Sequence, residues 1–186
     1  MPARLAILAP GLLGASVARA ARHFGAAESI AVWARRPETR VALRQEAWVD
    51  RVADTPADAV RGADLVAVCA PVDRIVPLIA EIAPHVETDA LVTDVGSVKA
   101  EICRHASTAL AGRVPFIGSH PMAGSEKTGW EHGRADLFVR RTIFITPLSE
   151  SDPRAAERLA AFWTALGGEV ASVAPPTDKE VNVVRA

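Results

Sequence analysis

Two stretches of the 186-residue sequence combine side chains that could move a proton beside a bound ligand. The first is residues 93–99, TDVGSVK, and the second is residues 118–129, which contain His120. A histidine with an ordinary pKa of about 6.5 is partly neutral at working pH and can accept a proton. A hydroxyl such as that of Ser97 can fix the tautomer of such a ring. Alone, His120 would be interpreted as a hydrogen-bonded loop residue, but its neighbours favour a catalytic role.

Short apolar runs alternate with helical stretches along the chain, which predicts an α/β fold with a Rossmann-like, mostly parallel sheet and helices on both faces. The predicted strands are residues 4–8, 29–33, 49–53, 65–69, 90–94, 114–118, 142–146 and 169–173, and the predicted helices are 12–24, 37–47, 72–83, 98–110 and 153–166. Both chemical stretches follow strands in this scheme. Open parallel sheets bind ligands outside the carboxyl ends of their strands, so both stretches are expected to face one crevice.

The turn after the first strand resembles a dinucleotide-binding fingerprint. Residues 9–14 read APGLLG, where the fingerprint is G-x-G-x-x-G between a strand and a helix. Gly11 falls where the backbone must approach a pyrophosphate, and Gly14 falls where the helix packs closely on the strand. Ala9 departs from the pattern, because it replaces the glycine of the tight turn. A plain turn with two glycines is the alternative, but its position after the first strand favours a nucleotide site.

The end of the second predicted strand bears on the choice of cofactor. An acidic residue there would bind the ribose 2′-hydroxyl of NAD, but this chain has Ala34 followed by Arg35 and Arg36. Guanidinium groups pair bidentately with a phosphate, so NADP is the preferred cofactor and NAD the alternative. The two arginines could instead be solvated surface charges, or one could stack on adenine in either cofactor.

Four motifs together resemble the prephenate/arogenate dehydrogenase family. They are the glycine turn followed by LLGAS, CAPV at residues 69–72, DVGSVK at 94–99 and GSHPMAGSE at 118–126, in matching order over roughly residues 4–173. The resemblance implies NAD(P)-dependent oxidative decarboxylation of prephenate or arogenate in tyrosine biosynthesis. Hydride would leave the ring C4 alcohol for the nicotinamide.

The resemblance also implies roles for individual residues. His120 matches the catalytic histidine, which takes up the proton of the ring hydroxyl, and Ser97 matches the serine that orients it beside the nicotinamide. Glu126 matches an acid near the substrate mouth. The cofactor-lining positions correspond to Gly11, Leu12, Leu13, Gly14, Arg35, Arg36, Ala70, Pro71 and Ser97.

Members of this family pair the nucleotide-binding domain with a C-terminal helical domain that dimerises and completes the active site. Residues 1–174 are therefore expected to form the Rossmann-like domain, and residues 175–186 a linker or the start of a helical domain that we expect to be missing from this chain. A homodimer is expected only if that domain is present. The alternative functions are an isolated nucleotide-binding module or fragment without independent catalysis, and another NADP-linked enzyme of the same superfamily.

Composition excludes several classes of protein. Lys and Arg total 21 and Asp and Glu total 22, a formal net charge of −1, which argues against a nucleic-acid partner. No apolar run reaches the roughly 20 residues that span a bilayer. The run from Leu5 to Ala18 superficially resembles a signal peptide, but its charged region is a single arginine. Two cysteines suit a reducing cytoplasm, where we expect the protein to lie.

The other reactive side chains have ordinary interpretations. His23, His85, His105 and His132 lack partners at metal-ligand spacing, so no metal is predicted. Cys69 ends a strand and is interpreted as a small core residue. Lys99 and Lys127 could attract an acidic substrate or be solvated.

Overall fold

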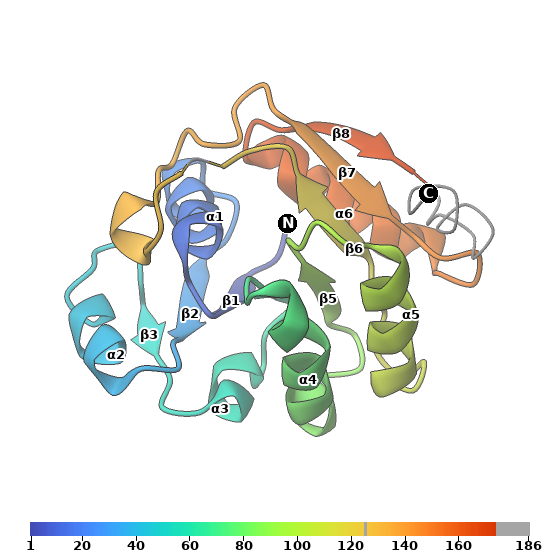
Figure 1. Cartoon of the computed structure of the whole chain (residues 1–186), viewed down its shortest axis with the longest axis horizontal. Coiled ribbons are helices and arrows are strands. Elements are labelled where there is room, and N and C mark those ends of the chain that lie inside the picture. The colour runs from blue at the N-terminus through green and yellow to red at the C-terminus, as the bar shows by residue number, and fades with distance from the viewer. Residues whose placement is uncertain (125, 174–186) are drawn as a thin grey trace.

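The computed structural model describes residues 1–124 and 126–173, and its centre is a parallel five-stranded sheet (Figure 1). The strands lie in the order β3-β2-β1-β4-β5. They comprise β1 Arg4–Leu8, β2 Ser29–Trp33, β3 Arg51–Val52, β4 Leu65–Val68 and β5 Leu91–Asp94. The chain runs outward from β1 to β3 and then crosses back to β4. The switch point of the sheet, where ligands bind in such folds, therefore lies between β1 and β4.

Helices cover both faces of this sheet, as the sequence predicts. The helices are α1 Leu12–His23, α2 Pro37–Leu43, α3 Pro56–Val60, α4 Val72–Ile82, α5 Ala100–Ala109 and α6 Pro153–Ala165. One apolar core contains residues of α1 and α6, and a second contains residues of α3, α4 and α5. Residues of β1 alternate between them, with Leu5 and Ile7 in the first core and Ala6 and Leu8 in the second. A strand buried on both faces explains the continuous apolar run of its sequence.

A second, three-stranded sheet follows, in the order β6-β7-β8. It comprises β6 Gly118–Pro121, β7 Thr142–Thr146 and β8 Glu169–Ser172, with β6 antiparallel to β7 and β7 parallel to β8. The predicted strand at 114–118 is wrong in its bounds, because its centre, Phe116, makes only an isolated parallel bridge to Val92. His120 therefore lies within a strand rather than in a loop after one.

Smaller differences concern element ends. The helix predicted at 37–47 ends at Leu43, where i→i+3 hydrogen bonds tighten the chain into turns. The strand predicted at 49–53 has two residues, and the helix predicted at 98–110 covers 100–109. The short α3 was not predicted; the Thr55 side chain caps it by accepting a hydrogen bond from the Asp58 N–H at 3.1 Å. Among the described residues, no helix is both long and apolar enough to cross a membrane.

Candidate functional site

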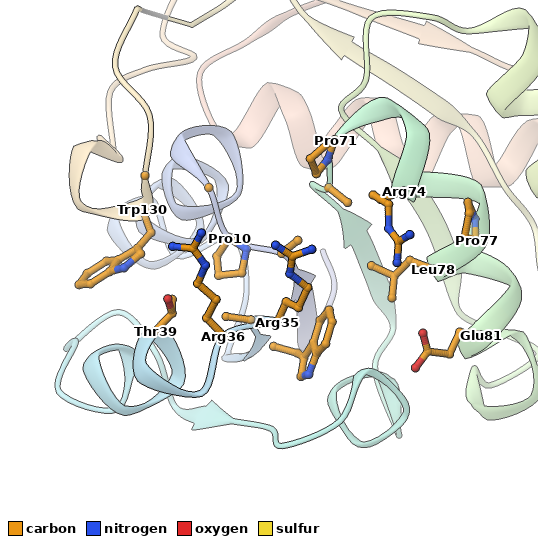
Figure 2. A pocket seen from close by; sticks show the side chains of 16 residues that line it. Pro10, Arg35, Arg36, Thr39, Pro71, Arg74, Pro77, Leu78, Glu81 and Trp130 are labelled. Atoms are coloured by element: carbon orange, nitrogen blue, oxygen red, sulfur yellow. The ribbon is translucent and has the colours of Figure 1, made fainter.

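A pocket of about 390 Å³ opens at the carboxyl edge of the central sheet (Figure 2). Its floor comes from the turn after β1, its two walls from the segments that follow β2 and β4. Five residues predicted to bind a cofactor line it: Gly11, Arg35, Arg36, Ala70 and Pro71. The volume lies within the range of small-molecule sites. The switch point of the sheet thus coincides with a cavity.

The turn at residues 9–14 keeps the shape of a glycine-rich turn despite the alanine in it. Ala9 has φ +58°, a left-handed conformation that glycine adopts without strain, and its N–H donates a hydrogen bond to the Trp33 carbonyl oxygen at 2.8 Å. A Cβ on Gly11 would meet no protein atom within 4 Å. One on Gly14 would lie 2.9 Å from the Cβ of Cys69, the residue after β4, so Gly14 lets α1 pack closely there. The open space at Gly11 and the helix N-terminus behind it suit a pyrophosphate.

The segment after β2 is held by an arginine other than the two that line the pocket. Arg40 donates hydrogen bonds from Nη1 to the carbonyl oxygens of Ala34 (2.9 Å) and Arg35 (3.1 Å), and its Nε lies 3.6 Å from an Asp54 carboxylate oxygen. Arg35 and Arg36 are exposed, and neither guanidinium has an ion pair or a hydrogen bond within residues 1–124 and 126–173. Both groups therefore remain available to an anion in the pocket.

Sequence reasoning missed several pocket residues. Trp33 and Thr39 lie on the β2 side, and α4 adds four residues. Arg74 could have been predicted from the sequence, because it follows Pro71 by one helical turn. Trp130 was not, since it comes from the distant short helix η2 (Trp130–His132). The residues concerned are Trp33, Thr39, Arg74, Pro77, Leu78, Glu81 and Trp130.

The segment with Trp130 is fixed against α1. A Cβ on Gly133 would lie 2.7 Å from the Ala15 Cβ and 3.0 Å from the Ala15 carbonyl carbon, so the backbone there touches the helix directly. The Arg134 N–H donates to the Ser16 hydroxyl at 2.9 Å, and that hydroxyl donates to the Leu12 carbonyl oxygen at 2.7 Å. The first turn of α1 and the wall that holds Trp130 form one packed unit.

His120 lies on β6, which a buried ion pair ties to the end of β5. Lys99 and Asp94 form this pair, with side chains 9% and 0% exposed, and the Lys99 ammonium also donates to the Ser119 carbonyl oxygen at 2.8 Å. The Asp94 carboxylate accepts hydrogen bonds from the N–H groups of Gly96 (2.8 Å) and Ser119 (3.3 Å). The residue before His120 is therefore held on both its N–H and its carbonyl.

The Ser119 side chain anchors the same strand from the opposite side. Its hydroxyl lies 2.7 Å from the Thr93 hydroxyl and accepts a hydrogen bond from the Trp163 indole N–H at 3.0 Å. All three side chains are buried. Strand β6 is thus fixed to β5 and α6, which gives His120 a rigid support.

The surroundings of His120 favour a neutral imidazole. Partial burial lowers the pKa of His120 below 6.5, the positive charge of Lys99 lowers it further, and the negative charge of Asp94 opposes the shift. A neutral ring has a free acceptor nitrogen. The imidazole of His120 is therefore available as a proton acceptor at neutral pH.

The remaining predicted site residues are not all gathered around the pocket. Ser97 is exposed after β5 and makes no hydrogen bond to His120 in the described part of the chain. Glu126 is also exposed and lines a separate hollow that includes Leu12 and Arg140. Leu13 packs against the first apolar core, and Gly14 is buried.

Both cysteines behave as packing residues. Burial raises the pKa of the Cys69 thiol far above its ordinary range, and the Asp94 carboxylate adds to that rise. Burial also raises the pKa of the Cys103 thiol, to about 11. Neither thiol is poised as a nucleophile, in line with the interpretation of Cys69 as a core residue.

Comparison with known proteins gives a consistent result. Residues 17–172 match the family described as prephenate dehydrogenase, nucleotide-binding domain. The chain is 32% identical to cyclohexadienyl dehydrogenase of Zymomonas mobilis over 166 residues, which are 89% of this chain and 56% of that protein. It is 30% identical to prephenate dehydrogenase of Bacillus subtilis, over 94% of this chain and 47% of that protein. The chain thus spans about half the length of the curated relatives it matches.

Solved structures give the same match at the level of the fold. Synechocystis arogenate dehydrogenase superposes with a TM-score of 0.85 at 29% identity, over 92% of this chain and 60% of that one. Prephenate dehydrogenase from Aquifex aeolicus, in complex with hydroxyphenyl propionate and NAD⁺, superposes with a TM-score of 0.85 at 26% identity, over 92% and 60% of the two chains.

Proposed function

The chain belongs to the family of prephenate dehydrogenase nucleotide-binding domains, and we propose that it carries the NAD(P) site and the proton acceptor of an enzyme that oxidatively decarboxylates prephenate or arogenate. The observation that supports this most directly is the pocket at the switch point of the sheet, lined by Gly11, Arg35 and Pro71. His120 is rigidly held on the neighbouring sheet, past the end of β5. In this proposal residues 1–174 are the nucleotide-binding domain; residues 174–186 lie outside the described part.

In this proposal His120 is the proton acceptor of the reaction. When bound, the nicotinamide ring of the cofactor would accept hydride from the ring carbon that bears the hydroxyl. The free imidazole nitrogen of His120 would take the proton of that hydroxyl, so that a carbonyl forms at the carbon. The carboxylate of the substrate would leave as carbon dioxide, and its bonding electrons would complete the aromatic ring, so that the carbonyl oxygen becomes a phenolate and takes a proton back. Because aromatisation drives the reaction, the protein mainly has to orient the reactants.

Ser97 and Glu126 are proposed to support this step. Ser97 follows β5, next to the Asp94–Lys99 pair, and its exposed hydroxyl is free of protein partners among the described residues. It would orient the His120 ring in the complex with substrate and cofactor. Glu126 would act at the mouth of the substrate site, from the segment that joins β6 to η2.

NADP is the proposed cofactor, with NAD as the alternative. Ala34 stands where an acidic residue would bind the 2′-hydroxyl of NAD, and Arg35 and Arg36 present unpaired guanidinium groups to the pocket. A carboxylate there would repel a 2′-phosphate, whereas guanidinium groups bind it with charge-assisted hydrogen bonds. We further propose that Leu12, Leu13 and Gly14 contribute backbone N–H groups to the pyrophosphate, and that Ala70 and Pro71 contact the cofactor after β4.

A second candidate function is a nucleotide-binding module that does not catalyse the reaction unaided. The matched family model favours this alternative, because it describes a nucleotide-binding domain. A helical half of the enzyme would then supply the residues that recognise the side chain of prephenate or arogenate. It would also supply any dimer contacts. A cytoplasmic location is proposed for either function.

The test is a paired equilibrium titration of the purified chain with NADPH and NADH. The proposal predicts binding of both, with NADPH at least tenfold tighter. Similar affinities for NADPH and NADH would be consistent with a dehydrogenase domain but would contradict the preference for NADP. Failure to bind either nucleotide would contradict the proposed function. Adding prephenate or arogenate to the NADP⁺ complex and following reduced cofactor then separates an active enzyme from a binding module.

A further inference from the structure

One face of α4 forms a second wall of the nucleotide pocket. Arg74, Pro77, Leu78 and Glu81 all line the cavity and recur on successive turns of the helix, at spacings of three and four residues. The first wall comes from the end of β2 and the start of α2. A ligand in the pocket would therefore contact two elements that are separate in the sequence.

Arg74 gives this second wall a positive charge. Its side chain is exposed, and its guanidinium has no ion pair or hydrogen bond within the part of the chain that the structure describes. Its backbone N–H donates to the Pro71 carbonyl oxygen at 2.8 Å. All three arginines line the same pocket, and in Figure 2 Arg35 lies between Arg36 and Arg74. Glu81 lies farther along the helix and is the carboxylate of the lining set.

Three unpaired guanidinium groups around one cavity repel one another, and an anion between them relieves that repulsion. Three guanidinium groups against the carboxylate of Glu81 give the cavity an excess of positive charge, which concentrates ligands of the opposite sign. Arg74 stands in the first turn of α4, whose N-terminal dipole adds to the positive potential. Leu78 and Pro77 beside it are apolar and suit the face of a base. The α4 wall thus offers one phosphate-binding group next to an apolar surface.

We propose that Arg74 binds a phosphate of the adenosine half of the dinucleotide from the α4 wall, opposite Arg35 and Arg36. The inference rests on the proposed function, because it requires a phosphorylated nucleotide in this pocket. The phosphate could be the 2′-phosphate of NADP or the 5′-diphosphate shared by both cofactors. The chemistry of recognition is the same, a guanidinium pairing with phosphate oxygens.

The experiment compares Arg74→Ala with Arg154→Ala by calorimetric titration of the whole chain. Arg154 is a matched control, because it is also exposed in the first turn of a helix, α6, and does not line the pocket. The probes are NADPH, 2′-AMP, 5′-ADP and adenosine. Arg74→Ala is expected to weaken NADPH about tenfold and one of the two phosphorylated fragments similarly, while adenosine binding is unchanged.

The results with 2′-AMP, 5′-ADP and adenosine show which phosphate Arg74 binds and which outcomes overturn the inference. Loss confined to 2′-AMP assigns the 2′-phosphate, and loss confined to 5′-ADP assigns the diphosphate. Equal losses for adenosine and the nucleotides would show that Arg74 contacts the base, and unchanged NADPH affinity would show no contact; both overturn the inference while the proposed function stands. If the unsubstituted chain binds neither NADPH nor NADH, both proposals fail. Arg74→Lys should recover part of the affinity, which excludes a general folding defect.

Discussion

Lys99 donates a hydrogen bond from its ammonium group to the carbonyl oxygen of Ser119 at 2.8 Å, across the junction of the two sheets. The same ammonium group pairs with Asp94, which in turn accepts the Ser119 N–H. The residue that precedes His120 is therefore positioned by a charge pair at the end of another strand. A buried pair in this position links the stability of the fold to the geometry of the candidate site.

Replacing Lys99 by Met tests the contribution of that pair to stability. The substitution would leave the fully buried Asp94 without its counter-ion, which costs about 3–5 kcal/mol in comparable cases. Urea denaturation of the two proteins measures the difference in the free energy of unfolding. The control is Arg61→Met, which removes an exposed pair with Asp58 (2.9 Å) and should cost about 0.5 kcal/mol or less. Equal losses for the two variants would mean that the buried pair adds nothing special.

His120→Ala should abolish turnover while leaving nucleotide affinity nearly intact. The imidazole is the proposed proton acceptor and does not line the nucleotide pocket. The measurement pairs steady-state rates, in an enzyme that contains these residues together with a substrate-binding half, with NADPH titration of the chain itself. A variant that kept more than about a tenth of the wild-type rate would contradict the role given to His120, since positioned general bases contribute about 10²–10⁴-fold.

Replacing both Arg35 and Arg36 by Ala should weaken NADPH at least tenfold more than NADH. Each lost charge-assisted hydrogen bond to a 2′-phosphate is worth about 1.5–3 kcal/mol, whereas NADH has no such phosphate to lose. Fluorescence titration of the double variant with both reduced cofactors measures the ratio of affinities. Parallel losses for NADPH and NADH would instead indicate stacking on adenine.

The lowered pKa of His120 predicts the pH dependence of the site. Because a proton acceptor works only when neutral, activity should fall on the acid side with an apparent pKa below 6.5. Proton NMR of the imidazole C–H signals, assigned with His120→Gln, gives the titration of this residue directly in the chain. Between the lowered pKa and 6.5 the unfolded chain binds more protons than the folded one, so this residue makes stability rise with pH across that window. A His120 titration above 6.5 would refute the electrostatic argument.

Ala9 predicts an asymmetry between a smaller and a larger substitution. Glycine adopts the observed φ of +58° freely, so Ala9→Gly should leave stability unchanged or raise it by up to about 1 kcal/mol. A β-branched residue is poorly tolerated there, so Ala9→Val should cost about 1–2 kcal/mol and weaken NADPH binding. Ala111, with φ +52°, is the control. Ala111→Val should cost a similar amount in thermal unfolding and leave NADPH affinity unchanged.

The parts of the fold that sequence predicts well are those with local signals. The turn at Ala9–Gly14 and the buried run of β4 each carry their signal within a few residues. Strand β6 does not, because Gly118 and Pro121 are poor strand formers and their pairing depends on β7, more than 20 residues away. The strand was predicted too early in the sequence because the residues before Gly118 are apolar. Their apolar character reflects burial in the core rather than strand pairing.

The residues of the candidate site likewise fall into those that local sequence patterns predict and those that they do not. Arg35, Arg36 and Pro71 were predicted because ligand-binding residues follow strand ends in this class of fold. Trp130 was missed because its position depends on a contact between η2 and α1 that no local pattern specifies. The distance in space between Ser97 and His120 likewise depends on how the second sheet packs, which cannot be predicted from local sequence patterns.

The close approach of Gly133 to Ala15 limits how this part of the molecule can vary. A side chain at 133 would meet both the Ala15 methyl group and the backbone of α1, so the wall with Trp130 would have to move outward to hold it. In an alignment of relatives with this geometry, position 133 should therefore remain glycine and position 15 should remain small. An enzyme engineer who exchanges the loop at 126–134 would have to transfer residue 15 of α1 with it.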